Sequence, residues 1–158
     1  MERSEGPIRI ALPNASTAEV NLAAAMAERL NAVVPAGFRV VAVEGFVSLY
    51  HEDEWEGSNG LHGLVDRRVN PSAAACARES FAWLLARGAW NILSGVQDGV
   101  AETTREPWPK LPQRGMANPG TRTDGRWVYM WFGPDEESEA EAVLALPPID
   151  VDALGASV

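Results

Sequence analysis

Apolar residues recur at helical spacing in the stretch 16–34, which therefore predicts an amphipathic helix. Ser16 and Glu19 form a capping box, in which each side chain can satisfy a backbone N–H of the other residue. Pro35 and Gly37 stop the pattern. The apolar positions of this stripe are Val20, Ala23, Ala27, Leu30 and Val34.

A second helical pattern runs over 71–104. Asn70 is a plausible N-cap, and Pro71 fits the first helical position. The stripe contains three glycines, which predicts either one long helix or two helices broken near Gly88. Glycines on one stripe also favour close approach of a sheet or another helix. The stripe consists of Phe81, Leu84, Leu85, Gly88, Ile92, Gly95, Val96 and Gly99.

Period-two alternation and β-branched or aromatic residues predict strands elsewhere. The stretches 38–43 and 46–50 read as a hairpin around Glu44-Gly45. A turn at Asp124-Gly125 leads into an aromatic strand over 127–132. The stretch 142–151 reads as a last strand, which its two prolines confine to a sheet edge or terminate.

The order of these elements is α-β-β-α-β-β. It predicts an α+β fold of two layers, an antiparallel sheet with helices on one face. We expect a single domain over 1–158, with irregular tails at 1–13 and 152–158. No internal sequence repeat is evident.

Composition narrows the classes of partner. The 46% apolar content supports a folded core, and a formal net charge of −9 opposes binding to nucleic acid but suits a basic protein partner. No apolar run is long enough to span a membrane, and no secretory signal pattern is visible. The single cysteine, Cys76, cannot form an internal disulfide, so a reducing cytoplasm is the expected location.

The sequence lacks the motifs that several classes of enzyme require. The chain has twelve arginines but only one lysine, Lys110, which lies between a proline and a leucine. That excludes a phosphate-binding Walker loop and argues against kinase or pyridoxal-phosphate chemistry. A G-x-S-x-G elbow is absent, and Cys76 among alanines reads as a core residue.

Residues 50–68 raise the question of a metal site, since they hold two histidines and five carboxylates. The segment HEDEW falls one residue short of the zinc motif H-E-x-x-H, because Trp55 stands where the second histidine is needed. A looser Zn, Mn or Fe shell is the remaining metal hypothesis. A solvated acidic loop without any cofactor is the favoured interpretation. The candidate ligands are His51, Asp53, His62 and Asp66.

The six tryptophans are a high number for a chain of 158 residues. The 127–132 strand offers large apolar side chains on both faces, one for the core and one for a second chain or a ligand. Trp and Arg are enriched at interface hot spots. An acidic run at 135–141 reads as a charged turn or a surface for a basic partner. The predicted partner-binding residues are Trp108, Arg126, Trp127, Tyr129 and Trp131.

The leading hypothesis is a non-enzymatic protein-binding module of the chaperone, adaptor or assembly-component type, self-associating as a homodimer. The architecture is similar in outline to small secretion-chaperone-like and immunity-type proteins, without any shared motif. Alternatives are a metal-dependent hydrolase or oxygenase centred on His51 and His62, an acidic inhibitor or immunity-type protein, and a binder of small apolar ligands.

Overall fold

The computed structural model describes residues 15–60, 77–112 and 115–155. Its elements follow the order α-β-β-β-α-β-β-β-α, which confirms the α+β class with antiparallel strands but adds one strand to each half and a final helical turn. The elements are α1 (Ala15–Asn31), β1 (Phe38–Val43), β2 (Phe46–His51), β3 (Glu54–Gly60), α2 (Ala77–Thr104), β4 (Asn118–Thr123), β5 (Trp127–Gly133), β6 (Leu144–Asp150) and α3 (Val151–Leu154).

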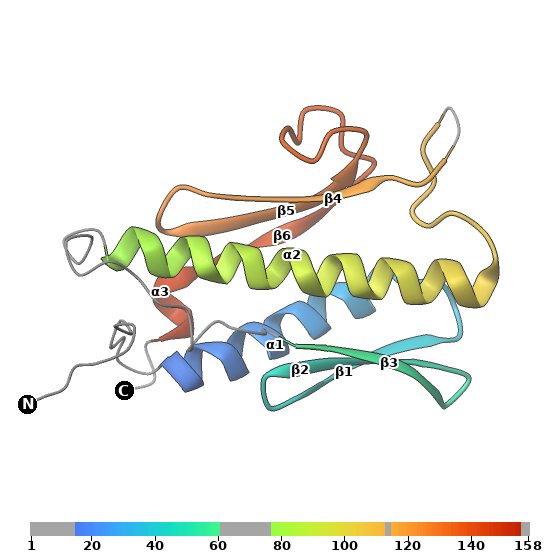
Figure 1. Ribbon diagram of the computed structural model, residues 1–158, viewed down its shortest axis with the longest axis horizontal. Helices are drawn as coiled ribbons and strands as arrows, with labels where there is room; N and C mark the ends of the chain where they lie inside the picture. Colours follow the sequence, from blue (N-terminus) through green and yellow to red (C-terminus); the bar gives the residue numbers. More distant parts are fainter. Residues whose placement is uncertain (1–14, 61–76, 113–114, 156–158) are drawn as a thin grey trace, which may run out of the picture.

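The strands form two three-stranded antiparallel sheets, in the orders β1-β2-β3 and β4-β5-β6. Helices α1 and α2 lie between the sheets, so the structure has three layers (Figure 1). The strands thus lie in two sheets rather than in the predicted single sheet, and the predicted two-layer arrangement is not confirmed. That prediction placed strands from both halves of the chain in one sheet, with the helices on one of its faces.

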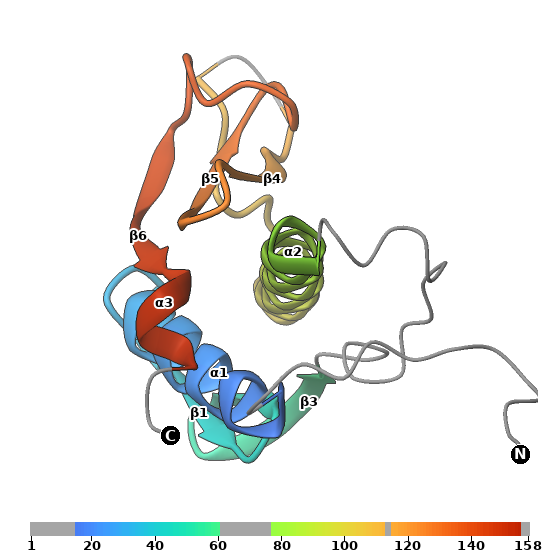
Figure 2. The same cartoon turned by 90° about the vertical axis from the view of Figure 1, so that its left-hand side faces the viewer.

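Each long helix packs on both sheets, because its buried residues extend around more than one face. Helix α1 contacts β1 and β2 on one side and β6 on the other, while α2 contacts β2 and β3 as well as β4 and β5. Figure 2 shows α2 end-on, between β3 and β4. The fully buried residues of α2 are Ala82, Leu85, Ala89, Ile92, Leu93, Val96 and Val100.

Helix α2 is continuous from Ala77 to Thr104, and Gly88 does not break it; the predicted start at 71–76 lies outside the described residues. The glycine stripe does permit close approach of a sheet. A Cβ at Gly99 would lie 2.6 Å from the Leu49 side chain of β2. At Gly95 it would collide with the amide group of Asn59 in β3.

Strands β3 and β4 were not predicted, because their sequences EWEGSNG and NPGTRT lack alternating apolar residues. Pairing with β2 and β5 makes them strands. Strand β6 forms a sheet edge and continues through its two prolines to Asp150, as the first of the two readings of this strand expected. Residues 152–154, expected in an irregular tail, belong to α3, where Leu154 is buried and its carbonyl accepts a hydrogen bond from Asn21 at 2.6 Å.

None of the helices in the described ranges has the length and apolar character needed to cross a membrane.

Candidate protein-binding face

The aromatic strand β5 separates its side chains between the core and the outer face of its sheet. Val128, Met130 and Phe132 are buried in the core. The alternate residues Trp127 and Tyr129 are only partly buried and point away from the core. Because side chains alternate along a strand, the sequence could predict two faces but not which one is covered.

Two arginines lie over these rings. The Arg122 guanidinium carbon is 4.1 Å from the centroid of Tyr129, its cross-strand partner on β4. The Arg126 guanidinium carbon is 5.5 Å from the Trp127 ring. Both distances allow cation–π attraction. We call Arg122, Arg126, Trp127 and Tyr129 the arginine–aromatic face.

Carboxylates surround the arginine–aromatic face. Arg126 donates two hydrogen bonds to Asp150, at 3.1 and 3.0 Å, and its Nε lies 3.6 Å from Asp152. Arg122 donates to Glu139 at 2.5 Å. The Glu139 hydrogen bond raises the pKa of Arg122, and the Asp150 hydrogen bond raises the pKa of Arg126. Both guanidinium groups are therefore held in place as cations.

The turn between β4 and β5 also belongs to this network. Gly125 supplies a positive φ of 99°, and the Asp124 carboxylate accepts from the backbone N–H groups of Trp127 and Arg126 at 2.9 and 3.0 Å. These bonds lower the pKa of Asp124. The Tyr129 hydroxyl donates to Asp124 at 3.3 Å. Loss of water around the hydroxyl and the Asp124 charge raise the pKa of Tyr129.

Of the five predicted partner-binding residues, Arg126, Trp127 and Tyr129 lie together on this face. Trp131 is also on β5, but it is fully buried, and its indole N–H donates to the Asp135 carbonyl at 3.0 Å. Trp108 packs with its ring 5.5 Å from that of Phe132, against the core. Arg122 was not among those five predicted residues. Predicting β4 would have revealed it, since a turn at Asp124-Gly125 pairs Arg122 with Tyr129.

The segment HEDEW forms a tight hairpin between β2 and β3. Its two turn residues, Glu52 and Asp53, have φ of 52° and 70°, as a two-residue type I′ turn requires. His51 stacks on Phe38 with ring centroids 4.4 Å apart, and Asp53 lies 3.7 Å from Arg39. The described part of the predicted acidic loop, 52–60, is therefore a turn and a strand, and the rest of that loop lies outside the described residues.

The metal hypothesis stays a prediction. Two of its candidate ligands, His62 and Asp66, lie outside the described residues. Within the ranges that the structure describes, no group of three or more His, Cys, Asp or Glu side chains is placed to hold a metal ion.

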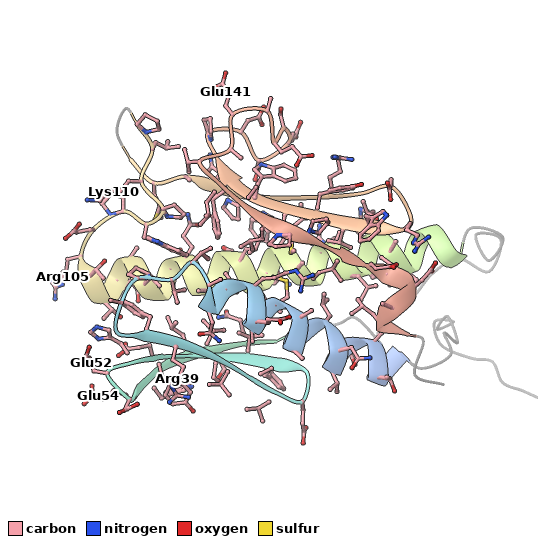
Figure 3. All side chains as sticks on the ribbon, turned by 180° about the vertical axis from the view of Figure 1, so that it is seen from behind. Arg39, Glu52, Glu54, Arg105, Lys110 and Glu141 are labelled. Carbon is pink, nitrogen blue, oxygen red and sulfur yellow. The ribbon has the colours of Figure 1, made fainter. Side chains whose placement is uncertain are left out.

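The two acidic runs lie beside different sheets, since 135–141 belongs to the connection between β5 and β6. Figure 3 labels Glu52 and Glu54 beside β1-β2-β3 and Glu141 beyond the opposite sheet. An acidic inhibitor that mimics nucleic acid would need its carboxylates gathered on one face. The described acidic residues are not gathered in that way, and the acidic-inhibitor alternative stays a prediction.

Comparisons of the chain with protein-family models, curated proteins and solved structures found no match. Functional inference therefore rests on the geometry of this chain. The arginine–aromatic face combines partly exposed rings, fixed cations and surrounding carboxylates, which is an arrangement suited to contact with another protein surface.

Proposed function

We propose that this protein is a non-enzymatic protein-binding module, of the chaperone, adaptor or assembly-component type, that forms a homodimer through its arginine–aromatic face. The observation that carries the proposal is the placement of Trp127 and Tyr129, each partly buried and each beneath an arginine, on the outer face of a sheet. Trp, Tyr and Arg are the residues most enriched among interface hot spots. We propose that the protein is located in the cytoplasm, since a single cysteine allows no internal disulfide.

The charge pattern supports pairing of two copies. A two-fold interface places the same surface patch on both subunits, so the patch must complement itself. Here Arg122 and Arg126 lie next to Glu139, Asp150 and Asp152. A rotated second copy can set its carboxylates against these arginines, while the rings meet at the centre.

The test is sedimentation of the purified protein over a range of concentrations, with Trp127→Ala as the main variant. We expect a wild-type dimer whose dissociation constant rises at least about tenfold in the variant, as for a hot-spot residue. Trp127 is preferable to Trp131, because removing the buried Trp131 ring would damage the fold itself.

Charge reversal supplies a matched control. Arg126→Glu should also weaken the dimer, whereas Arg105→Glu, an equal charge change at the far end of α2, should leave it intact. Circular dichroism checks that each variant is folded. A wild-type chain that stays monomeric at high micromolar concentration, or a Trp127→Ala variant that dimerises as the wild type does, would refute self-association through this face.

A further inference from the structure

The four edge strands of the two sheets differ in how their backbone is covered. An uncovered edge presents unpaired N–H and C=O groups to which another strand can bond, so proteins usually cover it. At β1, the side-chain amide of Asn31 at the end of α1 donates to the Val40 carbonyl at 2.6 Å and accepts from the Val40 N–H at 2.8 Å. Asn31 thus replaces the backbone of a neighbouring strand.

At β4, two side chains of α2 cover the edge. The Trp90 indole N–H donates to the Pro119 carbonyl at 3.0 Å. Gln97, which is buried, donates to the Ala117 carbonyl, directly before β4, at 2.5 Å. The edge of β4 is therefore bonded to the helix beside it.

At β6, one arginine of α1 covers the edge. Arg29 donates to the carbonyls of Pro147 and Pro148 at 2.8 and 3.0 Å. The two prolines have no N–H groups, so this stretch of β6 also offers no donors to an added strand.

The described residues provide no such cover at the edge of β3. Within the described ranges, no side chain bonds to the backbone of Glu54–Gly60, and Thr103 of α2 reaches only the Glu56 carboxylate, at 3.2 Å. The strand contains neither proline nor lysine, and Trp55 is 62% exposed. We propose that the free edge of β3 binds an extended, basic segment of a partner protein, which adds to β1-β2-β3 as a fourth strand.

The bulge in β3 indicates where the added strand would pair. The register shifts between Leu49 and Tyr50 of β2, which pair with Gly57 and Trp55, so Glu56 is the extra residue. A bulge strengthens the local twist and disrupts regular pairing next to the hairpin. The regular stretch is Gly57–Gly60, which is long enough for a short strand addition.

The surroundings of β3 favour a basic segment. A hollow of about 470 Å³ lies between β3 and α2, lined by residues that include Phe46, Asn59, Trp90 and Asp98. Among the described residues that line it, Asp98 is the one charged residue. Alternate side chains of an added strand would point into this hollow, where an arginine or lysine can pair with Asp98 and lie against the aromatic rings.

A second copy of this chain fits the β3 edge less well. Pairing of β3 with itself would bring the exposed Glu54, Glu56 and Asp98 of one copy toward those of the other, between chains that each carry a net charge of −9. Like charges brought together in this way oppose association. A basic segment has the complementary charge.

This surface is separate from the arginine–aromatic face, which lies on the opposite sheet (Figure 1). The two proposals can therefore fail independently. Trp127→Ala should weaken the dimer and leave binding at β3 unchanged.

The experiment uses the full chain and a defined probe. The probe is a capped peptide of about seven residues that alternates arginine and valine, the length of an ordinary strand. Its control is the same peptide N-methylated at every residue, which keeps the charges but cannot donate backbone hydrogen bonds. Amide exchange and chemical shifts measured by NMR locate the binding edge.

We expect the peptide to slow amide exchange within β3 and to shift its signals, and we expect N-methylation to weaken binding at least about tenfold. The double variant Glu54→Gln/Asp98→Asn should weaken binding several-fold. Glu136→Gln/Glu137→Gln, which removes two carboxylates beside the other sheet, should not weaken it.

Three results would overturn the proposal. One is equal binding of the N-methylated peptide, which would show charge attraction without strand addition. Another is slowed amide exchange at the edge of β1, β4 or β6 in place of β3, or no slowing of exchange at any of the four edges. The third is full protection of the β3 amides before any peptide is added, which would show that a second copy or another part of the chain already covers this edge.

Discussion

The indole of Trp131 occupies the space that a side chain at Gly120 would need. The two residues are cross-strand partners on β4 and β5. A Cβ at Gly120 would lie 2.4, 2.5 and 2.6 Å from three atoms of the ring, which is closer than van der Waals contact allows. The ring is fully buried and anchored through its N–H to Asp135, so it has little room to move aside.

Gly120→Ala should therefore destabilise the protein. We expect the free energy of unfolding to fall by about 1–3 kcal/mol, as is typical of overpacking. Urea unfolding followed by circular dichroism measures it. Gly155→Ala is the matched control, because a Cβ there meets nothing within 4 Å. Equal stability of the two variants would show that the Trp131 ring is free to shift.

Single residues also explain why some features of the fold could not be predicted from the sequence. The usual signal for a two-residue hairpin is Asn-Gly or Asp-Gly, yet here Glu52 and Asp53 adopt the positive φ values. At the first hairpin, Glu44 rather than Gly45 has the positive φ, of 55°. Burial of Trp131 could not be predicted either, because it depends on the segment at Asp135, which covers the ring.

At the scale of elements, one residue at the end of α1 bonds to the backbone of β1. Asn31 both donates to and accepts from the backbone of Val40, and it does so at the last residue of the helix. An amide side chain is needed, because it offers a donor and an acceptor at the same time. Sequence patterns predicted the helix and the strand but gave no indication of this cross-link.

Asn31→Ala should lower the free energy of unfolding by about 1–3 kcal/mol, since it leaves the polar groups of Val40 without their partner. It should also speed amide exchange at Val40 more than elsewhere in β1. Asn91→Ala, an equal change at an exposed position of α2, controls for the loss of an asparagine. Unchanged exchange at Val40 would show that water replaces the Asn31 amide at no cost.

The junction of β6 and α3 predicts a dependence of stability on pH. The hydrogen bonds from Arg126 lower the pKa of Asp150, so the folded chain binds a proton there less readily than the unfolded chain does. The stabilisation is present at neutral pH and is lost as the pH falls through the lowered pKa, because Asp150 is then protonated in both states.

Asp150→Asn should give a small fall in melting temperature at neutral pH, since the ion pair is exposed, and the difference from wild type should vanish in acid. Asparagine keeps the cap of α3, where Asp150 accepts from the Asp152 N–H at 3.0 Å. Asp98→Asn is the control, because Asp98 has no ion-pair partner among the described residues. A difference from wild type that persists in acid would assign the effect to the cap instead.

Elements with a strong apolar pattern were predicted, and those without one were not. The patterns of α1, β1, β2, α2 and β5 come from residues that face the core directly. The segments of β3 and β4 form strands because each lies beside a neighbouring strand and α2. Their sequences, rich in glycine, asparagine and threonine, fit that position without specifying it.

At the scale of the whole molecule, the chain consists of two α-β-β-β units whose helices are shared. Helix α1 packs on β1 and β2 of its own unit and on β6 of the other, while α2 packs on β4 and β5 of its own unit and on β2 and β3 of the other (Figure 2). The repetition is one of topology, and it was not visible as a repeated sequence. Neither sheet has a core of its own.

This sharing predicts that the two sheets unfold together. Leu49 of β2 is 2% exposed and lies against Gly99 of α2, so Leu49→Ala should lower the free energy of unfolding by about 2–5 kcal/mol. Because α2 also supports the other sheet, amides of β5 should lose as much exchange stability as those of β2. Val43→Ala, at an exposed position of β1, should change neither by much. If Leu49→Ala weakened β2 while β5 kept its wild-type stability, the two α-β-β-β units would open independently, and the shared helices would not couple them.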